Sequence, residues 1–368
     1  MNTAIAAQRL QNQCITRAGS HAPADVVAWL GAVQSQEFPA ARWGLGLRMA
    51  EGTTDREVER AFDEGRILRT HVMRPTWHFV TPSDIRWILD LTAPRVHRAM
   101  AHYRRRHGLE TTILTRAAAI FERALRDGRY LTRPELGLQL GRDGRLRTVP
   151  GVAKGIPLAL LTIYAELEGI VCSGPSRGKQ PTYALLAGRA PGAMRLSRDE
   201  ALAELTRRYF TSHGPATIRD FVWWSGLTSA DAKRGLEMTR AWHDIIDGRT
   251  YWNLGQTKAR AGTRHRPVHL LPVYDEYLVA YRDREAVPHG PPVIKSPSGE
   301  RVTFQHALVI AGQVAGTWRT VRKASELIVE ITPVRRLTRP ERRALDETAA
   351  HYGRFLDAPV SVAIADLP

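Results

Sequence analysis

The sequence is poor in cysteine, lysine and long apolar runs, and each shortage excludes a class of protein. Its 368 residues hold two cysteines, Cys14 and Cys172, which excludes a disulfide framework and a multi-cysteine zinc site. No stretch approaches the ~20 consecutive apolar residues that span a bilayer. The N-terminal segment also lacks the basic flank and apolar run of a signal peptide. We therefore expect a cytoplasmic protein with no membrane association.

Motifs for phosphate loops and metals are also missing. The segment Gly174–Gln180 is one residue short of a phosphate-binding P-loop, and Gln180 stands where a Mg²⁺-binding hydroxyl belongs. His265 and His269 are four residues apart, but Pro267 between them denies them a shared helical face. The sequence therefore predicts neither a metal site nor a cofactor.

What the chain has in excess is arginine. Lysine and arginine number 53 against 37 acidic residues, which gives a formal net charge of +16. Only six of these basic residues are lysine, a bias that GC-rich coding explains, but such coding does not explain the excess over acidic residues. The surplus indicates a polyanionic partner, nucleic acid first and an anionic membrane surface second.

A recurring order of helices followed by two short strands predicts an α+β protein with three tandem winged-helix domains. We place them at residues 1–110, 111–190 and 191–262, and we expect a C-terminal β-rich domain closed by a helix at 263–368. The expected elements of the first copy are helices at 25–33, 40–48 and 55–63 and strands at 67–73 and 77–81. In the second copy they are helices at 112–126 and 153–168 and a hairpin at 170–173 and 181–186.

Caps and turns mark the third copy most clearly. Ser197 and Glu200 form a capping box that begins a helix. Asp247-Gly248 is a strong hairpin signal between two short β-prone runs. We therefore predict a helix that ends near Thr211, a helix–turn–helix and a two-stranded wing.

Two glutamines, Gln34 and Gln36, stand out in an apolar setting shortly before Pro39. On a helix their side chains would point about 200° apart, but in an extended segment they share one face. Pro39 disfavours a helical conformation at Phe38 and so favours an extended path. Each amide offers an acceptor and donors, so the pair could hold one water molecule.

Several segments in order along the chain carry a family resemblance. They are Val33–Glu37, Leu68–Thr70, Arg74–Val80, Leu271–Leu278, Arg282–Arg284 and Gly312–Arg319. In these segments the chain resembles the winged-helix DNA glycosylases of the azinomycin-resistance (AlkZ) type, which have three tandem winged helices and a Gln-x-Gln motif in the first. Ser35 departs from this pattern, because the family has an apolar residue between the two glutamines.

The resemblance implies excision of alkylated purines, especially N7-alkylguanine adducts, and some family members unhook interstrand crosslinks. Such an enzyme would serve DNA repair or self-resistance to a DNA-alkylating natural product. An N7-alkylated guanine is already cationic, so the enzyme must add only a positioned water and electrostatic support. We assign Gln34 and Gln36 jointly to water placement, with Glu37 as a rival base. The alternative is that both glutamines only satisfy buried backbone groups.

Basic residues of the wings and helices are the candidate DNA contacts. They are Arg69, Arg74, His78, Arg104, Arg105, Arg177, Lys179, Arg282, Arg284, Lys295 and Arg319. For His78 the alternatives are a hydrogen bond within the site and an ordinary core position. Lys295 lies in a Pro-rich loop, 286–300, which either probes DNA or is a linker. We expect Asp275 to pair with Arg282 or Arg284.

These features predict a monomer that acts on double-stranded DNA containing alkylated purines. The competing interpretation is a non-enzymatic winged-helix regulator, but such regulators usually dimerise on palindromic sites, and this chain has no obvious coiled-coil segment. The first lysine, Lys154, lies outside the first winged helix. Because a lyase step normally uses an amine nucleophile, we expect a monofunctional glycosylase.

Overall fold

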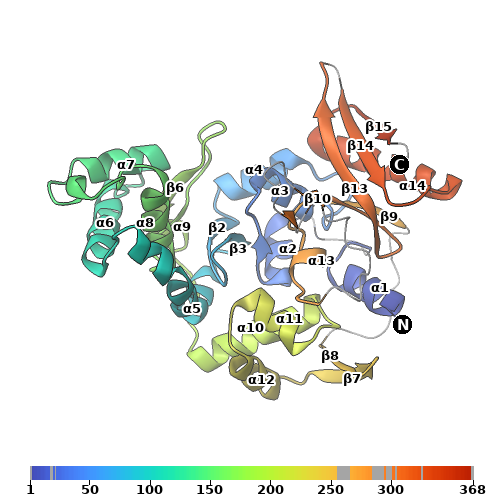
Figure 1. Cartoon of the computed structure of the whole chain (residues 1–368), viewed down its shortest axis with the longest axis horizontal. Coiled ribbons are helices and arrows are strands. Elements are labelled where there is room, and N and C mark those ends of the chain that lie inside the picture. The colour runs from blue at the N-terminus through green and yellow to red at the C-terminus, as the bar shows by residue number, and fades with distance from the viewer. Residues whose placement is uncertain are drawn as a thin grey trace.

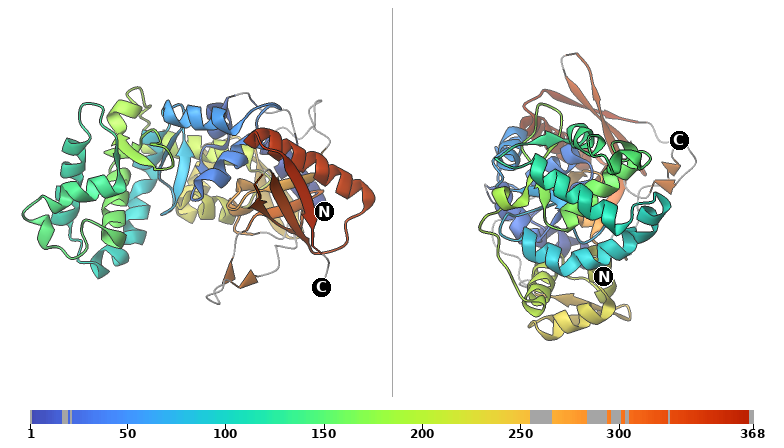
Figure 2. Two further views of the ribbon diagram at one scale, coloured as in Figure 1. Left: turned by 90° about the horizontal axis from the view of Figure 1, so that it is seen from above. Right: turned by 90° about the vertical axis from the view of Figure 1, so that its left-hand side faces the viewer.

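The computed structural model describes residues 2–16, 20, 22–254, 266–283, 294–295, 301–302, 305–324 and 326–365. Helices alternate with small, mostly antiparallel sheets, which confirms the predicted mixed α+β fold. The molecule is elongated, with residues 111–190 at one end and the C-terminal sheet at the other (Figures 1 and 2). None of the helices in the described part of the chain has the length and apolar character needed to cross a lipid bilayer.

The first section is a helical layer against a three-stranded sheet. Its elements are α1 (Asn2–Asn12), α2 (Pro23–Leu30), β1 (Val33–Gln34), α3 (Phe38–Gly46), α4 (Asp55–Asp63), β2 (Leu68–His71) and β3 (Trp77–Val80). The strands are antiparallel in the order β1-β3-β2. The helix predicted at 25–33 ends at Leu30, because Gly31 takes a positive φ of 83° and turns the chain into β1. The extended path predicted for the glutamine segment is therefore confirmed at Gln34.

A long helix that the sequence did not predict follows this sheet. Helix α5 (Ile85–Arg106) has 22 residues and contains Pro94. Proline inside a helix removes a backbone hydrogen bond, so its presence hid the helical pattern. The first half of α5 packs with the third section, around Trp87 and Leu91, and its second half packs with the second section, around Val96 and Met100. The helix therefore ties three sections together.

The second section contains α6 (Thr111–Ala124), β4 (Leu131–Thr132), α7 (Arg133–Gly141), a 3₁₀ turn (Leu146–Thr148), α8 (Gly155–Leu167), β5 (Val171–Ser173), β6 (Thr182–Leu185) and α9 (Leu186–Arg189). Its strands form an antiparallel sheet in the order β4-β6-β5. The predicted helices at 112–126 and 153–168 and the predicted hairpin are all confirmed within a few residues.

The third section contains α10 (Arg198–Ser212), α11 (Ile218–Ser225), α12 (Ser229–Glu237), β7 (Trp242–Ile246) and β8 (Arg249–Asn253). The capping box is confirmed, because the Glu200 carboxylate accepts the backbone N–H of Ser197 at 2.8 Å. The hairpin turn is also confirmed, since Asp247 and Gly248 have positive φ angles of 49° and 73°.

The C-terminal section is β-rich, as predicted. Its elements are β9 (Val268–Leu271), α13 (Glu276–Val279), β10 (Ile294–Lys295), β11 (Arg301–Val302), β12 (Ala307–Ile310), β13 (Gln313–Arg322), β14 (Leu327–Pro333), α14 (Arg339–Leu356) and β15 (Val360–Ile364). The main sheet has the order β15-β14-β13-β12-β9, with only the β14–β15 pair parallel. We did not predict β15, which follows α14 and completes the sheet edge (Figure 1).

One hydrophobic core joins the first section to the C-terminal section. Trp43 and Phe79 pack in the same buried cluster as Trp318 and Phe355. Trp43 lies 5.1 Å from the Phe355 ring, measured between centroids. The glutamine segment is therefore held between two parts of the chain that are more than 200 residues apart.

Candidate active site around Gln34 and Gln36

Gln34 is fixed by contacts from the first section and from the C-terminal section. It is 5% exposed and lies opposite His78 in the β1–β3 pair. Its backbone N–H donates to Oε1 of Glu276 at 2.7 Å. Its side-chain Oε1 accepts a hydrogen bond from Nη2 of Arg74 at 2.8 Å. The orientation of this amide is thus set by the protein itself.

Gln36 lies just beyond the strand and is half-buried. Its Oε1 accepts from the backbone N–H of Trp77 at 3.3 Å. The Ser35 N–H donates to the Trp77 carbonyl at 2.7 Å, which continues the strand pairing past Gln34. The Arg69 guanidinium donates to the carbonyls of Ser35, at 3.0 and 2.8 Å, and of Gln36, at 3.2 Å. These contacts fix Gln36 in the bend that follows β1.

His78 is a neutral neighbour of Gln34. Paired residues of antiparallel strands project to the same face, so the two side chains lie beside each other. Burial and the nearby Arg74 lower the pKa of His78 to about 3. Its Nδ1 lies 3.0 Å from the Thr76 carbonyl and therefore carries the proton, while Nε2 has no hydrogen-bond partner among the described residues. Because His78 is fully buried, we correct the expectation that it lies on a DNA-facing surface.

Glu276 is a buried carboxylate beneath Gln34. Its Oε1 accepts from Gln34, and its Oε2 accepts from Nε1 of Trp224 at 3.0 Å. Nε2 of His213 lies 3.5 Å from Oε2, at the outer limit of a hydrogen bond. Burial raises the pKa of Glu276, but the contacts with His213 and the Gln34 N–H outweigh burial and leave that pKa below its usual range. An anion therefore lies directly behind the glutamine segment.

Arg69 and Trp77 border a cleft of about 250 Å³, and residues of the second section form the rest of its lining. The Arg69 guanidinium carbon lies 4.2 Å from the centroid of the Trp77 ring. Burial lowers the pKa of Arg69 to about 10, so it stays a cation at neutral pH. Nε1 of Trp77 donates to Glu166 at 3.3 Å, and the same carboxylate contacts His71. The first and second sections are thus joined by polar contacts next to the glutamines.

Most of the other candidate DNA contacts lie at the surface. The exposed ones are Arg105, Arg177, Lys179, Arg282 and Arg319. Arg177 also pairs with Glu135 at 2.8 Å, and Arg319 pairs with Glu330 at 2.6 Å. These positions are accessible to a polyanion, and their role in DNA binding stays a prediction.

Arg104 does not belong to that set. It is 8% exposed, and its guanidinium contacts Nδ1 of His97 at 3.0 Å and the carbonyl of the same residue. The side chain folds back along α5 and donates a hydrogen bond to the His97 carbonyl, about two turns earlier. The expectation of a solvated, phosphate-facing Arg104 is therefore corrected, whereas its neighbours Arg105 and Arg106 are exposed.

Arg282 borders a basic cleft of about 570 Å³ in the third section. Arg219 and Arg249 line the same cleft, together with the beginning of α11. The Arg282 guanidinium carbon lies 5.3 Å from the Trp223 ring centroid, and Arg249 pairs with Asp283. Asp283 also lines this cleft and neutralises Arg249, so Arg219 and Arg282 are the candidate contacts for an anionic ligand such as a phosphate group.

Asp275 pairs with a different arginine from those we expected. Its two carboxylate oxygens accept from Nη1 and Nη2 of Arg48, both at 2.8 Å. Arg48 also donates to Gln13 at 2.9 Å, and both members of the pair are buried. The expectation of Arg282 or Arg284 was wrong because Arg48, at the end of α3, is carried to Asp275 by the shared core.

Some predictions fall outside the described residues. They concern Arg284, His265 and most of the loop 286–300, while Lys295 lies in β10 without a described side chain. Within the part of the chain that is described, no three histidine, cysteine or acidic side chains gather as metal ligands would. The absence of a metal site therefore stays a prediction.

Comparison with known proteins identifies the class of this protein. Residues 27–355 match the DNA glycosylase AlkZ-like family. The chain is 28% identical to the interstrand DNA cross-link repair glycosylase of Streptomyces sahachiroi, over 95% of each protein. It also matches the solved structure of the Streptomyces sahachiroi DNA glycosylase AlkZ with a TM-score of 0.80 and 25% identity, over 99% of each chain. This protein is a DNA glycosylase. More narrowly, it belongs to the AlkZ-like family.

Proposed function

We propose that this glycosylase hydrolyses the N-glycosidic bond of alkylated purines in double-stranded DNA, with N7-alkylguanine adducts as its substrates and interstrand crosslinks among them. Such an activity would serve DNA repair or self-resistance to a DNA-alkylating natural product. The name of the Streptomyces sahachiroi relative, a cross-link repair glycosylase, supports the inclusion of crosslinks.

The observation that carries this proposal is the fixed, neutral pair of amides at Gln34 and Gln36. Each Oε1 is oriented by a protein donor, and the neighbouring His78 is held neutral by burial. No strong base is therefore aimed at the site by these residues. Neutral amides can place a water molecule but cannot readily deprotonate it, which suits a substrate whose base is already an activated, cationic leaving group.

In the proposed reaction the C1′–N9 bond breaks first, and its electron pair neutralises the departing cationic base. The sugar becomes oxocarbenium-like, and the water held by Gln34 and Gln36 adds to C1′ and then loses a proton to solvent. The ionised carboxylate of Glu276 lies behind Gln34 and favours positive charge on the sugar. Positioning and electrostatics therefore supply the catalysis, with no metal and no cofactor.

We further propose that the helical sections with their strand pairs act as winged helices. The units are the predicted domains 1–110, 111–190 and 191–262, and 263–368 forms the β-rich domain. The antiparallel pairs β2–β3, β5–β6 and β7–β8, each preceded by helices, support this division. The protein would bind DNA as a monomer through exposed arginines on these units.

Base release from alkylated plasmid DNA tests the function. Wild-type protein should release free 7-methylguanine from methylated plasmid, measured by mass spectrometry, and should release no base from untreated plasmid. EDTA should not change the rate, and borohydride should trap no protein–DNA adduct, because the proposed step uses no metal and no amine. Binding of methylated DNA without base release would support a non-enzymatic regulator instead.

A further inference from the structure

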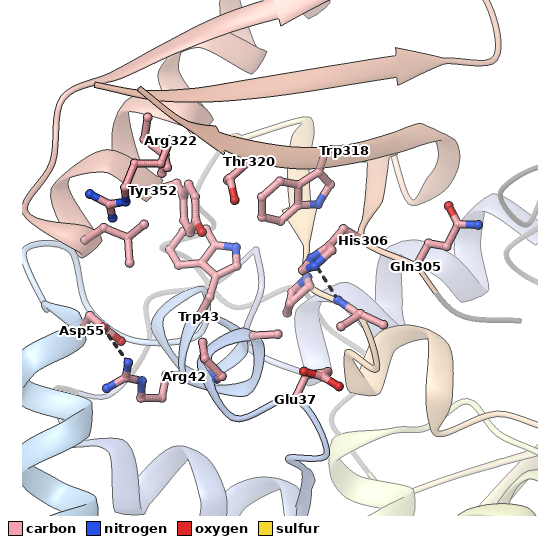
Figure 3. Close-up of a pocket in the computed structure, with 16 residues that line it drawn as sticks. Glu37, Arg42, Trp43, Asp55, Gln305, His306, Trp318, Thr320, Arg322 and Tyr352 are labelled. Carbon is pink, nitrogen blue, oxygen red and sulfur yellow. Dashed lines mark hydrogen bonds and ion pairs between the residues drawn. The ribbon is translucent and has the colours of Figure 1, made fainter. Parts of the chain in front are cut away.

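A cleft of about 720 Å³ opens beside the glutamine segment and has no role in the chemistry above. One wall starts at Glu37, the residue after Gln36, and continues along α3 to Trp43. The opposite wall comes from the C-terminal section, with His306 before β12, Trp318 and Thr320 of β13, and Tyr352 of α14 (Figure 3). We name this space the α3–β13 cleft.

Three aromatic rings form a rigid lining for the cleft. Nε1 of Trp43 donates to the Leu270 carbonyl at 2.7 Å, and Nε1 of Trp318 donates to the Leu271 carbonyl at 2.8 Å. The Tyr352 ring lies 4.8 Å from Trp43 and 5.3 Å from Trp318, both in edge-to-face geometry. Because consecutive carbonyls of β9 anchor the two indoles, the lining is preorganised to contact a flat ring.

His306 supplies a neutral polar group to this lining. Its Nδ1 lies 3.2 Å from the backbone N–H of Val273 and accepts that hydrogen bond, so the proton is on Nε2. Burial lowers the pKa of His306 to about 4, and the imidazole is therefore uncharged at neutral pH. Its ring packs edge-to-face on Trp318, with 4.7 Å between centroids. The cleft thus offers a neutral N–H donor, and the Glu37 carboxylate is an acceptor on its border.

The charges around the cleft argue against a phosphate ligand. Arg42 is neutralised by Asp55 and Glu59, each at 3.1 Å. The second arginine of the lining, Arg322, is offset by the Glu37 carboxylate, so the lining has no net positive charge. The His306 donor and the Glu37 acceptor suit a flat ring system with hydrogen-bond acceptors and donors on its edge. The Watson–Crick edge of guanine is of this kind. The volume lies within the range of about 300–1,000 Å³ that holds small-molecule ligands. It therefore has room for a purine that carries a substituent.

We propose that the α3–β13 cleft receives a planar aromatic group of the lesion outside the base stack. This inference rests on the proposed glycosylase function. The group is either the alkylated purine itself or an aromatic ring carried by its alkyl substituent, since the same aromatic lining would contact either flat ring. Glu37 joins the cleft directly to Gln36, so a group lodged there would remain next to the residues that place the water.

Strand β13 offers a matched pair of variants. Trp318, Thr320 and Arg322 line the cleft, and Val321 projects to the opposite face because side chains alternate along a strand. Thr320→Phe should fill the cleft, and Val321→Phe should add the same ring outside it. Thr320 is exposed and Val321 is half-buried, so thermal melting is used to check that each variant folds.

The first measurement needs no DNA and no catalysis. In equilibrium dialysis, wild-type protein should bind free 7-methylguanine or 7-benzylguanine, and Thr320→Phe should weaken that binding roughly tenfold or more, as expected for loss of aromatic stacking. Val321→Phe should bind as the wild type does. The proposal is overturned if neither compound binds the wild type, or if Thr320→Phe binds as tightly.

The second measurement uses duplexes that contain one 7-methylguanine or one 7-benzylguanine. If Thr320→Phe slows excision of both bases, the purine itself enters the cleft; if it slows only the benzyl adduct, the substituent does. Equal rates for Thr320→Phe and Val321→Phe on both duplexes would overturn the proposal. If the wild type releases neither base, the proposed function fails, and the dialysis still decides whether the cleft binds aromatic rings.

Discussion

The backbone N–H of Gln34 donates to Glu276 across 242 residues of sequence, with 2.7 Å between the two atoms. Glu276 also accepts from Trp224 in α11. A single carboxylate therefore connects the glutamine segment to the third section and to the C-terminal section. The placement of the proposed catalytic amides depends on the assembly of the whole chain, not on the first section alone.

Replacing Glu276 with glutamine tests whether its negative charge contributes to catalysis, because glutamine has nearly the same shape. Glu276→Gln retains an acceptor for Gln34 but removes the negative charge behind the site, so single-turnover base release should fall by roughly tenfold or more. DNA affinity should not change, because Glu276 is buried. Glu122→Gln, on the exposed face of α6, is the control. A wild-type rate in Glu276→Gln would remove the electrostatic role of this residue.

The middle residue of the motif offers a test of stability. Ser35 is fully buried, and its Oγ has no hydrogen-bond partner among the described residues. A buried unsatisfied hydroxyl costs about 1–3 kcal/mol, so Ser35→Ala should raise the free energy of unfolding by about 1 kcal/mol without loss of activity. Ser225→Ala is the matched control and should destabilise, because the Ser225 hydroxyl donates to Phe221 at 2.6 Å. Denaturant unfolding measures both effects, and a less stable Ser35→Ala would contradict the expectation.

The local elements of this fold could be predicted because their signals are local. The capping box at Ser197 and the turn at Asp247-Gly248 each need only a few neighbouring residues. The extended path at Gln34 followed in the same way from Pro39 and the residue spacing. Helix α5 was missed because Pro94 contradicts a helical interior, and the chain tolerates it there only through packing on two cores.

The contacts that build the site could not be predicted in the same way. Glu276 and Trp77 reach the glutamines through tertiary packing, and no sequence spacing encodes a contact over 242 residues. Asp275 was expected to pair with a nearby arginine, but Arg48 lies closer once α3 packs on the C-terminal section. Burial, which turns His78 into a neutral group, is likewise a property of the folded chain.

The titration of His78 should make the protein acid-sensitive. The folded protein keeps this imidazole neutral down to about pH 3, whereas the unfolded chain protonates it below about 6.5. Since the unfolded state then binds the extra proton, unfolding free energy should fall with decreasing pH across this window, by up to ~1.4 kcal/mol per pH unit for one such group. His78→Asn should show a shallower dependence in urea titrations between pH 4 and 6.5. Parallel curves for the two proteins would contradict this account.

The buried Arg48–Asp275 pair should matter far more than an exposed pair. Arg48→Met leaves the Asp275 carboxylate buried without its counter-charge, which should cost about 3–5 kcal/mol of stability. Arg319→Met breaks the exposed pair with Glu330 and should cost about 0–1 kcal/mol. The double variant Arg48→Met/Asp275→Asn should recover part of the loss. Equal destabilisation by the two single variants, in denaturant unfolding, would show that the buried pair has no special role.

The decisive variants are those of the two glutamines. Gln34→Ala and Gln36→Ala should each lower single-turnover release of 7-methylguanine by roughly 10²-fold or more, because each removes one of two groups that place the water. DNA affinity should stay unchanged, since neither side chain carries a charge for phosphate contact. Gln139→Ala in α7 should behave as the wild type and serves as the control.

Combined variants distinguish joint action from two separate roles. The double variant Gln34→Ala/Gln36→Ala should be little worse than the poorer single variant, because groups that act as one unit are not additive. Gln36→Asp should retain more activity than Gln36→Ala, since a carboxylate can accept the proton of the water and stabilise a cationic sugar. If both single alanine variants excise 7-methylguanine at the wild-type rate, the water is placed by other residues. Glu37, which borders both Gln36 and the α3–β13 cleft, would then be the first to test.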